Sequence, residues 1–273
     1  MVGGAATGDR CKGLGLFMIR VFYLNVFIGL YTIIMCVWAL IVGLFDKGDG
    51  KLVHFKVAVP WARGILRVCG VKLDVSGLAG VDAGLPRIYM ANHQSAFDIF
   101  ALLACLPVDF KFILKKELMK IPLFGPAMKR AGYIAIDRGD PRKAVASINS
   151  AAERIQAGAS VLIFPEGTRS ADGRIQAFKK GGFHLAVKSR CDIVPIAIIN
   201  SRNIVKKGSM KINSGRITMS IGKPLGVRDY GKRNLEQLMA RVRSSMISEM
   251  PGSESKEPVP VPRNPQSESF LSD

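Results

Sequence analysis

The sequence predicts an α/β fold, in which a mixed, largely buried β-sheet is flanked by helices and preceded by an N-terminal hydrophobic helical segment that anchors the chain to a membrane. Short β-rich runs alternate with helical runs from residue 71 onward, the pattern of such a domain. The chain has 273 residues, enough to bury a substantial core without disulfide bonds. One stretch, residues 21–45, has no charged side chain and is long enough to cross a bilayer.

The first predicted segment, residues 1–70, holds this apolar stretch and a basic continuation. A helix of this length, at roughly 1.5 Å per residue, matches a hydrocarbon core of about 30 Å. A cleaved signal peptide has a shorter apolar region of roughly 7–15 residues, so we interpret the stretch as an uncleaved anchor. Basic residues lie on both sides of it, and the charge rule therefore leaves both spanning and monotopic insertion open.

Residues 51–70 interleave apolar and basic side chains. This pattern is typical of a segment that lies along an anionic interface, and equally of an amphipathic helix that covers a protein core. Pro60 predicts a break or kink within it, because proline removes a backbone donor and its ring collides with the preceding turn.

The second segment, residues 71–250, is the predicted α/β domain. Its short β-rich runs predict strands at residues 71–75, 87–91, 111–114, 133–136, 161–164, 193–199 and 216–221. Helices are predicted between and after them, at residues 97–106, 142–157, 180–188 and 235–249. The last segment, residues 251–273, contains five Pro and five Ser and few large apolar side chains, so it is predicted to be a disordered tail.

The charge balance predicts an anionic partner. Lys and Arg total 39 against 21 acidic residues, a net charge of +18. Nucleic acid, phosphorylated metabolites and acidic lipid headgroups all fit such a surplus. The five cysteines are scattered and include no C-x-x-C, which excludes a zinc cage or disulfide framework of the usual spacing and favours a reducing compartment.

The first candidate catalytic group lies in residues 92–98, with the sequence NHQSAFD, between a predicted strand and a predicted helix. His93 and Asp98 are five positions apart, so the carboxylate can reach one imidazole nitrogen and leave the other to accept a proton. This pair suits an alcohol that loses its proton while it attacks an activated carbonyl. Ser95 is a poor nucleophile candidate because no G-x-S-x-G elbow surrounds it. The alternative is structural, since an acid in the first helical turn is itself stabilised by about 0.3–1 kcal/mol.

The second group lies in residues 161–170, with the sequence VLIFPEGTRS, where an apolar strand ends in a polar turn. Arg169 offers a fork of donors that suits a phosphate, and Thr168 adds a hydroxyl. The alternative is a structural turn with a surface ion pair between Glu166 and Arg169. A third, basic group runs from Lys111 to Arg138, and we expect Arg138, at the end of its strand, to point into the same crevice as Arg169.

Together, these groups resemble the glycerophospholipid acyltransferase family, and most closely its 1-acylglycerol-3-phosphate acyltransferases. The resemblance covers roughly residues 71–221, in blocks at 92–98, 115–138, 164–170 and 194–198. Ala135 departs from it, because a bulky aromatic residue is commoner there. The resemblance implies that His93 and Asp98 are catalytic. It implies that substrate is bound by Lys115, Arg138, Glu166, Gly167, Thr168, Arg169 and Pro195.

The implied reaction is direct acyl transfer, without an acyl-enzyme. His93, oriented by Asp98, removes the proton from the sn-2 hydroxyl of 1-acylglycerol 3-phosphate (lysophosphatidic acid) as it attacks an acyl thioester, forming phosphatidic acid for phospholipid biosynthesis. The thioester is acyl-CoA or acyl carrier protein, and glycerol 3-phosphate or another lysophospholipid is the alternative acceptor. No metal or further cofactor is expected.

The resemblance also implies a membrane phospholipid bilayer as partner, with the catalytic domain facing the cytoplasm from the inner membrane. We expect no nucleic-acid partner, because the basic surface carries no recognisable nucleic-acid-binding module.

Overall fold

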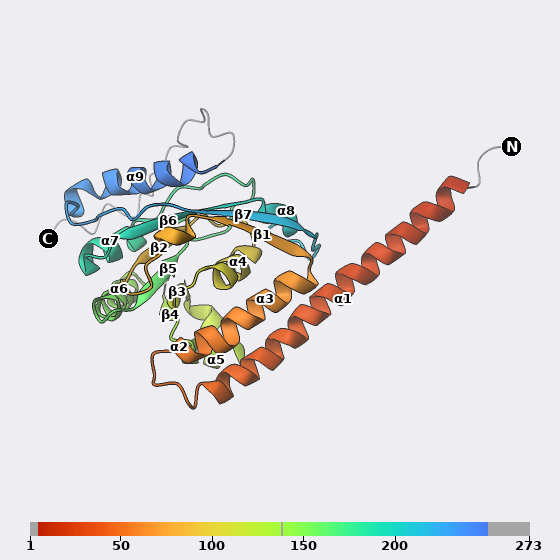
Figure 1. The fold of residues 1–273 in the computed structure, drawn as a ribbon, viewed down its shortest axis with the longest axis horizontal. Helices are drawn as coiled ribbons and strands as arrows, with labels where there is room; N and C mark the ends of the chain where they lie inside the picture. Colours follow the sequence, from red (N-terminus) through yellow and green to blue (C-terminus); the bar gives the residue numbers. More distant parts are fainter. Residues whose placement is uncertain (1–4, 138, 251–273) are drawn as a thin grey trace.

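A seven-stranded sheet forms the centre of the protein, seen in a computed structural model that describes residues 5–137 and 139–250 (Figure 1). Its strands lie in the order β1-β7-β6-β2-β5-β3-β4. Their bounds are β1 Val71–Ser76, β2 Ile88–Ala91, β3 Phe110–Lys115, β4 Ile134–Ile136, β5 Ser160–Ile163, β6 Ile193–Ile199 and β7 Gly215–Ile221.

The sheet is mixed. β2 pairs in parallel with β5 and β6, and β3 pairs in parallel with β4 and β5. β7 is antiparallel to β6 and parallel to β1, so β1 and β7 run against the other five strands. The carboxyl ends of the adjacent strands β2 and β5 therefore meet at one edge, where ligands usually bind in sheets of this kind.

Two hydrophobic cores lie on the two faces of the sheet. Alternate strand residues point to opposite faces, so Tyr89 belongs to one core while Ile88 and Met90 belong to the other. The first core is covered by α1 Ala5–Val42, α2 Lys51–Val53, η1 His54–Ala58, α3 Val59–Val68, α4 Phe97–Cys105 and α5 Phe124–Arg130. The second is covered by α6 Pro141–Gln156, α7 Lys180–Ser189 and α9 Leu235–Ser248 (Figure 1). Short helices connect these elements at η2 Leu78–Gly80, η3 Lys116–Lys120, α8 Ser201–Ile204 and η4 Lys232–Asn234.

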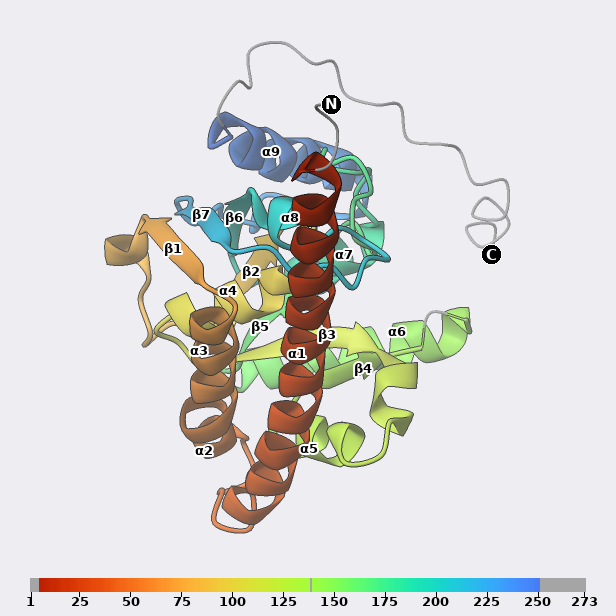
Figure 2. The same cartoon turned by 90° about the vertical axis from the view of Figure 1, so that its right-hand side faces the viewer.

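Helix α1 lies along the domain for much of its length and projects beyond it at the N-terminal end (Figures 1 and 2). Asn25 Nδ2 donates to the Met210 carbonyl oxygen at 2.9 Å, and Arg130 donates to the Gly43 carbonyl oxygen at 3.1 Å. Between these points Trp61 Nε1 donates to Thr32 Oγ1 at 3.1 Å. The part of α1 that is apolar enough to cross a membrane, Met18–Val42, is therefore fastened to the domain at several places.

Of the break or kink predicted at Pro60, the break is wrong. The chain stays helical from residue 51 to residue 68. Its first turns include a π-helical segment, in which Val59 N donates to the His54 carbonyl oxygen, and Pro60 follows in the first turn of α3. The wider π turn accommodates the proline ring where a regular turn would collide with it.

The predicted fold class is confirmed, and each predicted strand and helix of the α/β domain is present with its ends shifted by at most one residue. Helix α5 was not predicted, because Pro and Gly crowd its first turn. The division of the chain at residue 70 stays a prediction, and the proposed tail, residues 251–273, lies outside the described residues.

Candidate active site

The loop that carries His93 leaves the sheet at Asn92. The Asn92 side chain takes the place of a strand partner, since its Nδ2 donates to the Ile198 carbonyl oxygen at 2.8 Å and its Oδ1 accepts from Ile198 N at 2.6 Å. These two hydrogen bonds to β6 satisfy the backbone N–H and carbonyl groups of Ile198, where β2 ends. The following residues can therefore turn out of the sheet toward α4.

His93 and Asp98 are in direct contact. The distance from His93 Nδ1 to Asp98 Oδ2 is 2.8 Å. Asp98 is fully buried, whereas about 15% of the His93 side chain is exposed. Since a carboxylate only accepts, it holds the Nδ1–H tautomer and leaves Nε2 as the basic nitrogen.

Asp98 also has the structural role that the alternative interpretation gave it. Its Oδ2 accepts from Gln94 N at 2.6 Å and from Ser95 N at 2.8 Å, which closes the loop onto the first turn of α4. The Phe97 N–H is also engaged, by Ser95 Oγ at 3.3 Å. One carboxylate therefore fixes both the loop and the imidazole, and these three amides are not free donors for an oxyanion.

Glu166 joins the two motif loops from beneath. It is 2% exposed, and its Oε1 accepts from His93 N at 2.7 Å while its Oε2 accepts from Gln176 N at 2.9 Å. Burial raises the pKa of the Glu166 carboxyl to about 7, although both amide bonds act in the opposite direction. Because its oxygens are turned inward, the surface ion pair with Arg169 proposed as an alternative is wrong. A backbone–backbone hydrogen bond, from Ser170 N to the His93 carbonyl oxygen at 2.7 Å, also links the two motif loops.

The turn from Gly167 to Arg169 lies beside the His93 loop. Gly167 has a φ of +72°, a conformation that favours glycine. Thr168 is exposed and its hydroxyl accepts from Lys207 Nζ at 3.2 Å, while the Arg169 carbonyl oxygen accepts from the same ammonium at 2.9 Å. Sequence reasoning missed Lys207, which is distant in the chain and belongs to no motif.

The remaining predicted site residues are more widely placed. Lys115 ends β3 and its Nζ lies 3.6 Å from Glu117 Oε1. Pro195 is buried within β6, in register with Met90 of β2. Arg138 lies outside the described residues. Across residues 5–137 and 139–250, no group of three or more His, Cys, Asp or Glu side chains is placed to hold a metal ion.

A row of aromatic rings leads away from His93. Phe164 stacks on the imidazole with ring centroids 4.0 Å apart, and Phe112 lies 6.3 Å from Phe164 and 5.3 Å from Tyr133. Sequence reasoning gave Phe164 no role of its own, although it stands in the second motif. The stacking supports the imidazole from one face and extends an apolar wall toward α5.

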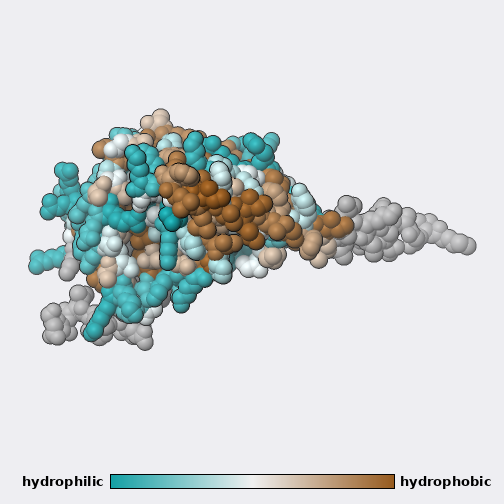
Figure 3. All heavy atoms as spheres, turned by 90° about the horizontal axis from the view of Figure 1, so that it is seen from below, coloured by the Kyte–Doolittle hydropathy of each residue, from teal (hydrophilic) through white to brown (hydrophobic). Residues whose placement is uncertain are grey.

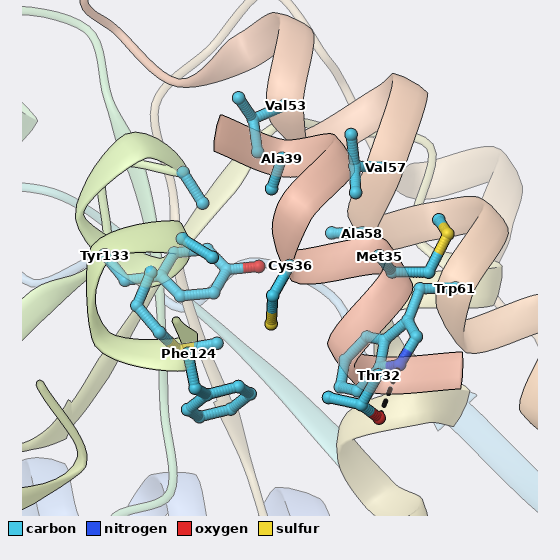
Figure 4. Close-up of a pocket in the computed structure, with 13 residues that line it drawn as sticks. Thr32, Met35, Cys36, Ala39, Val53, Val57, Ala58, Trp61, Phe124 and Tyr133 are labelled. Carbon is cyan, nitrogen blue, oxygen red and sulfur yellow. Dashed lines mark hydrogen bonds between the residues drawn. The ribbon is translucent and has the colours of Figure 1, made fainter. Parts of the chain in front are cut away.

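The aromatic row ends at an apolar pocket between α1, α3 and α5 (Figure 4). Apolar residues such as Trp61 and Phe124 line most of it, and the Tyr133 hydroxyl points into it toward Cys36. That hydroxyl is buried and has no hydrogen-bond partner among the described residues, and burial raises the pKa of Tyr133. A hydrocarbon group fits such a lining better than a polar ligand does.

Comparison with known proteins identifies the family. A family model described as Acyltransferase matches residues 72–199, the part of the chain that holds both motif loops. Residues 72–199 form a domain of the acyltransferase family. Similar curated acyltransferases include the chloroplastic 1-acyl-sn-glycerol-3-phosphate acyltransferase of Arabidopsis thaliana, which is 40% identical over 184 residues, or 67% of this chain and 51% of the relative.

Acyltransferases of the same printed name match over longer stretches at lower identity. That of Limnanthes alba is 28% identical over 92% of this chain and 90% of its own, and that of Salmonella typhimurium is 29% identical over 84% and 92%. The chain spans about half the length of the chloroplastic relatives of Arabidopsis thaliana and Brassica napus. The solved 1-acyl-sn-glycerophosphate acyltransferase of Thermotoga maritima shares the fold, with a TM-score of 0.72 and 24% identity over 84% of this chain and 92% of that one.

Proposed function

We propose that the chain transfers an acyl group from an acyl thioester to the sn-2 hydroxyl of 1-acylglycerol 3-phosphate, forming phosphatidic acid. The observation that carries this proposal is the 2.8 Å contact between the partly exposed His93 ring and the buried Asp98 carboxylate. The relatives named above, all 1-acyl-sn-glycerol-3-phosphate acyltransferases, support the same substrate class.

The proposed chemistry needs no nucleophile from the protein. His93 Nε2 removes the proton of the sn-2 hydroxyl as its oxygen attacks the thioester carbonyl carbon. The tetrahedral intermediate collapses, the carbon–sulfur bond breaks, and the imidazolium returns the proton to the leaving thiolate. General base catalysis of this kind contributes about 10²- to 10⁴-fold, and Asp98 stabilises the imidazolium between the two proton transfers.

Acceptor binding is assigned to the turn beside His93. Arg169 and Thr168 belong to the turn that is bonded to the imidazole loop through Ser170 N, and a guanidinium and a hydroxyl suit a phosphate and its glycerol backbone. The sequence-based predictions for Arg138, Lys115 and Pro195 are retained as part of this proposal. Acyl-CoA and acyl carrier protein both remain as donors, because both present a thioester next to anionic groups.

Helix α1 is proposed to face lipid. Hydrophobic side chains gather in one broad patch on the face seen from below, and the patch continues along α1 (Figure 3). Phe22, Leu30 and Trp38 are among the exposed apolar side chains of this helix. Because α1 is fastened to the domain near Asn25 and near Gly43, we propose that it lies against the domain with its outer side in the bilayer. This placement would hold the crevice close to the membrane, and we keep the sequence-based prediction that the domain faces the cytoplasm.

Trp38 makes this arrangement measurable. Phosphatidylcholine brominated on its acyl chains should quench the fluorescence of the vesicle-bound protein, and W38F should remove most of that quenching. Equal fluorescence in brominated and ordinary vesicles would contradict the placement of α1.

The acceptor panel tests the reaction itself. Purified protein in vesicles is given acyl-CoA or acyl carrier protein, with lysophosphatidate, glycerol 3-phosphate or lysophosphatidylcholine as acceptor, and thiol release is measured. We expect lysophosphatidate to give the highest kcat/KM with at least one donor. Higher kcat/KM with glycerol 3-phosphate or with lysophosphatidylcholine would replace the proposed acceptor by the alternative, and the absence of turnover with every pair would reject the reaction.

A further inference from the structure

Lys207, from a segment distant in the sequence, donates two hydrogen bonds to the turn that carries Arg169. Lys207 Nζ lies 3.2 Å from Thr168 Oγ1 and 2.9 Å from the Arg169 carbonyl oxygen. An ammonium has three N–H donors, so two are used on the turn, and no partner for the third is found among residues 5–137 and 139–250. Since the Thr168 hydroxyl accepts from Lys207, its own proton is free to be donated outward.

A second lysine covers the same turn from the other side. A methyl group built on Gly167 would lie 3.0 Å from Lys179 Cδ and Cε and 3.3 Å from Lys179 Nζ. The Lys179 side chain therefore runs directly over Gly167, in the space that the missing side chain leaves open. Its ammonium and that of Lys207 approach the turn from two separate segments, the start of α7 and the chain after α8.

The cations at this turn form no ion pair with an acid of the described residues, although Asp172 lies nearby, where its Oδ1 accepts from Ser170 Oγ at 2.8 Å. Among residues 5–137 and 139–250, no ion pair joins Lys179, Lys207 or Arg169 to a carboxylate. Glu166, the acid within the motif, is buried and directed at backbone amides. Two ammonium groups therefore lie against a partly exposed turn that carries Arg169 and the Thr168 hydroxyl and that is bonded to the His93 loop.

We infer that Lys179 and Lys207 are further phosphate-binding residues, which act with Arg169 to select a doubly charged phosphate monoester over a singly charged phosphodiester. This inference rests on the proposed function and goes beyond it, because neither lysine belongs to the predicted site. A monoester carries close to two negative charges at neutral pH, since its second pKa is about 6. Each additional cation therefore gains more from a monoester than from a phosphodiester headgroup.

The chain provides matched controls at adjacent positions. Lys180 pairs with Glu236 of α9 at 3.1 Å, so its ammonium is directed away from the turn. Lys206 is exposed, and no side-chain contact to the turn is found for it among the described residues. The variants K180M and K206M remove the same charge from the same segments as K179M and K207M, without removing the contacts at the turn.

The test compares these four variants and K207R in mixed micelles, with lysophosphatidate and lysophosphatidylcholine as acceptors. We expect K179M and K207M each to raise the KM for lysophosphatidate about tenfold, with kcat changed less than twofold, because one charge-assisted contact to the phosphate is lost. K180M and K206M should stay within twofold of the wild type. K207R should recover most of the affinity, and the residual rate with lysophosphatidylcholine should be similar in all variants.

A pH series separates binding from a purely structural role. For the wild type and K206M, the KM for lysophosphatidate should fall as pH rises from 5.5 to 7.5 and the phosphate gains its second charge. K207M should show a flatter dependence. An equal loss of kcat on both acceptors in K207M, or KM values that match K206M across the series, would overturn the inference. Neither result bears on the proposed function, which the acceptor panel tests with the wild-type protein alone.

Discussion

The two polar loops at the ends of β2 and β5 are held by specific hydrogen bonds, whereas the pocket between α1, α3 and α5 is formed by apolar packing. In the loops, three of the four carboxylate oxygens of Asp98 and Glu166 have named donors, such as His93 N on Glu166 Oε1, whereas Asp98 Oδ1 has no partner among the described residues. In the pocket, the Tyr133 hydroxyl has no hydrogen-bond partner among the described residues. Directional bonds define one reactive geometry, while apolar contacts tolerate ligands of varying shape. Changes to the His93–Asp98 pair should therefore lower the rate by orders of magnitude, changes to the turn that carries Arg169 should weaken acceptor binding, and changes in the apolar pocket should affect chain-length selectivity modestly.

Apart from replacing His93 itself, the change expected to lower activity most is neutralisation of its partner Asp98. D98N should lower kcat by roughly 10²- to 10⁴-fold, because the amide neither stabilises the imidazolium nor specifies the Nδ1–H tautomer. Its KM should change little. Steady-state kinetics beside a circular dichroism spectrum make the measurement, and a D98N enzyme with more than half of the wild-type kcat would contradict the assigned pairing.

Glu166 should make the free energy of unfolding of the protein depend on pH. The pKa of this carboxyl is about 7 in the folded chain against 4.5 as its ordinary value. Between these values the unfolded chain binds fewer protons than the folded one, so stability should fall as pH rises from about 5 to 8, by up to about 3 kcal/mol. Thermal unfolding in detergent across this range should show the decline. E166Q should show a flatter profile, and identical profiles for the two proteins would remove the cause we assign.

Arg169 tests recognition rather than chemistry. R169K should raise the KM for lysophosphatidate about tenfold and leave kcat nearly unchanged, because a single ammonium does not reproduce the two parallel bonds of a guanidinium. An unaltered KM, measured in the same micelles as the wild type, would exclude the phosphate contact.

Substitutions in the apolar pocket should have the smallest effect on activity. Ala127 is buried on α5 and lines the pocket, so A127L should narrow it and shift the preferred acyl donor toward shorter chains by a few-fold in kcat/KM. The matched control is A146L on the exposed side of α6. If A127L and A146L show the same chain-length profile, the pocket does not hold an acyl chain.

The same contrast explains how far the sequence could be interpreted. The strands and helices of the domain follow from local patterns, and so does the contact between His93 and Asp98, which needs only a five-residue turn. The bonds of Asn92 to Ile198 and of Glu166 to His93 join residues more than 70 positions apart, and their pairing depends on the strand order. Glu166 was therefore expected to contact substrate, whereas the structure directs it at backbone amides.

Tertiary context also decided the outcome at several other positions. Pro60 sits within a helix because a π turn precedes it, which no single-residue preference predicts. Lys207 acts on the motif turn from a segment that carries no motif. The N-terminal apolar helix was predicted from composition, but only the contacts of Asn25 and Gly43 reveal that it lies along the domain.

The central claim is that the His93 imidazole is the base that activates the acceptor hydroxyl. It is tested most directly by the rate of phosphatidate formation from lysophosphatidate in H93A, with H184A on the surface of α7 as the control histidine variant. We predict a loss of about 10²- to 10⁴-fold in kcat for H93A with an unchanged fold, and less than a twofold change for H184A. An H93A protein that keeps more than a tenth of the wild-type kcat would contradict the account.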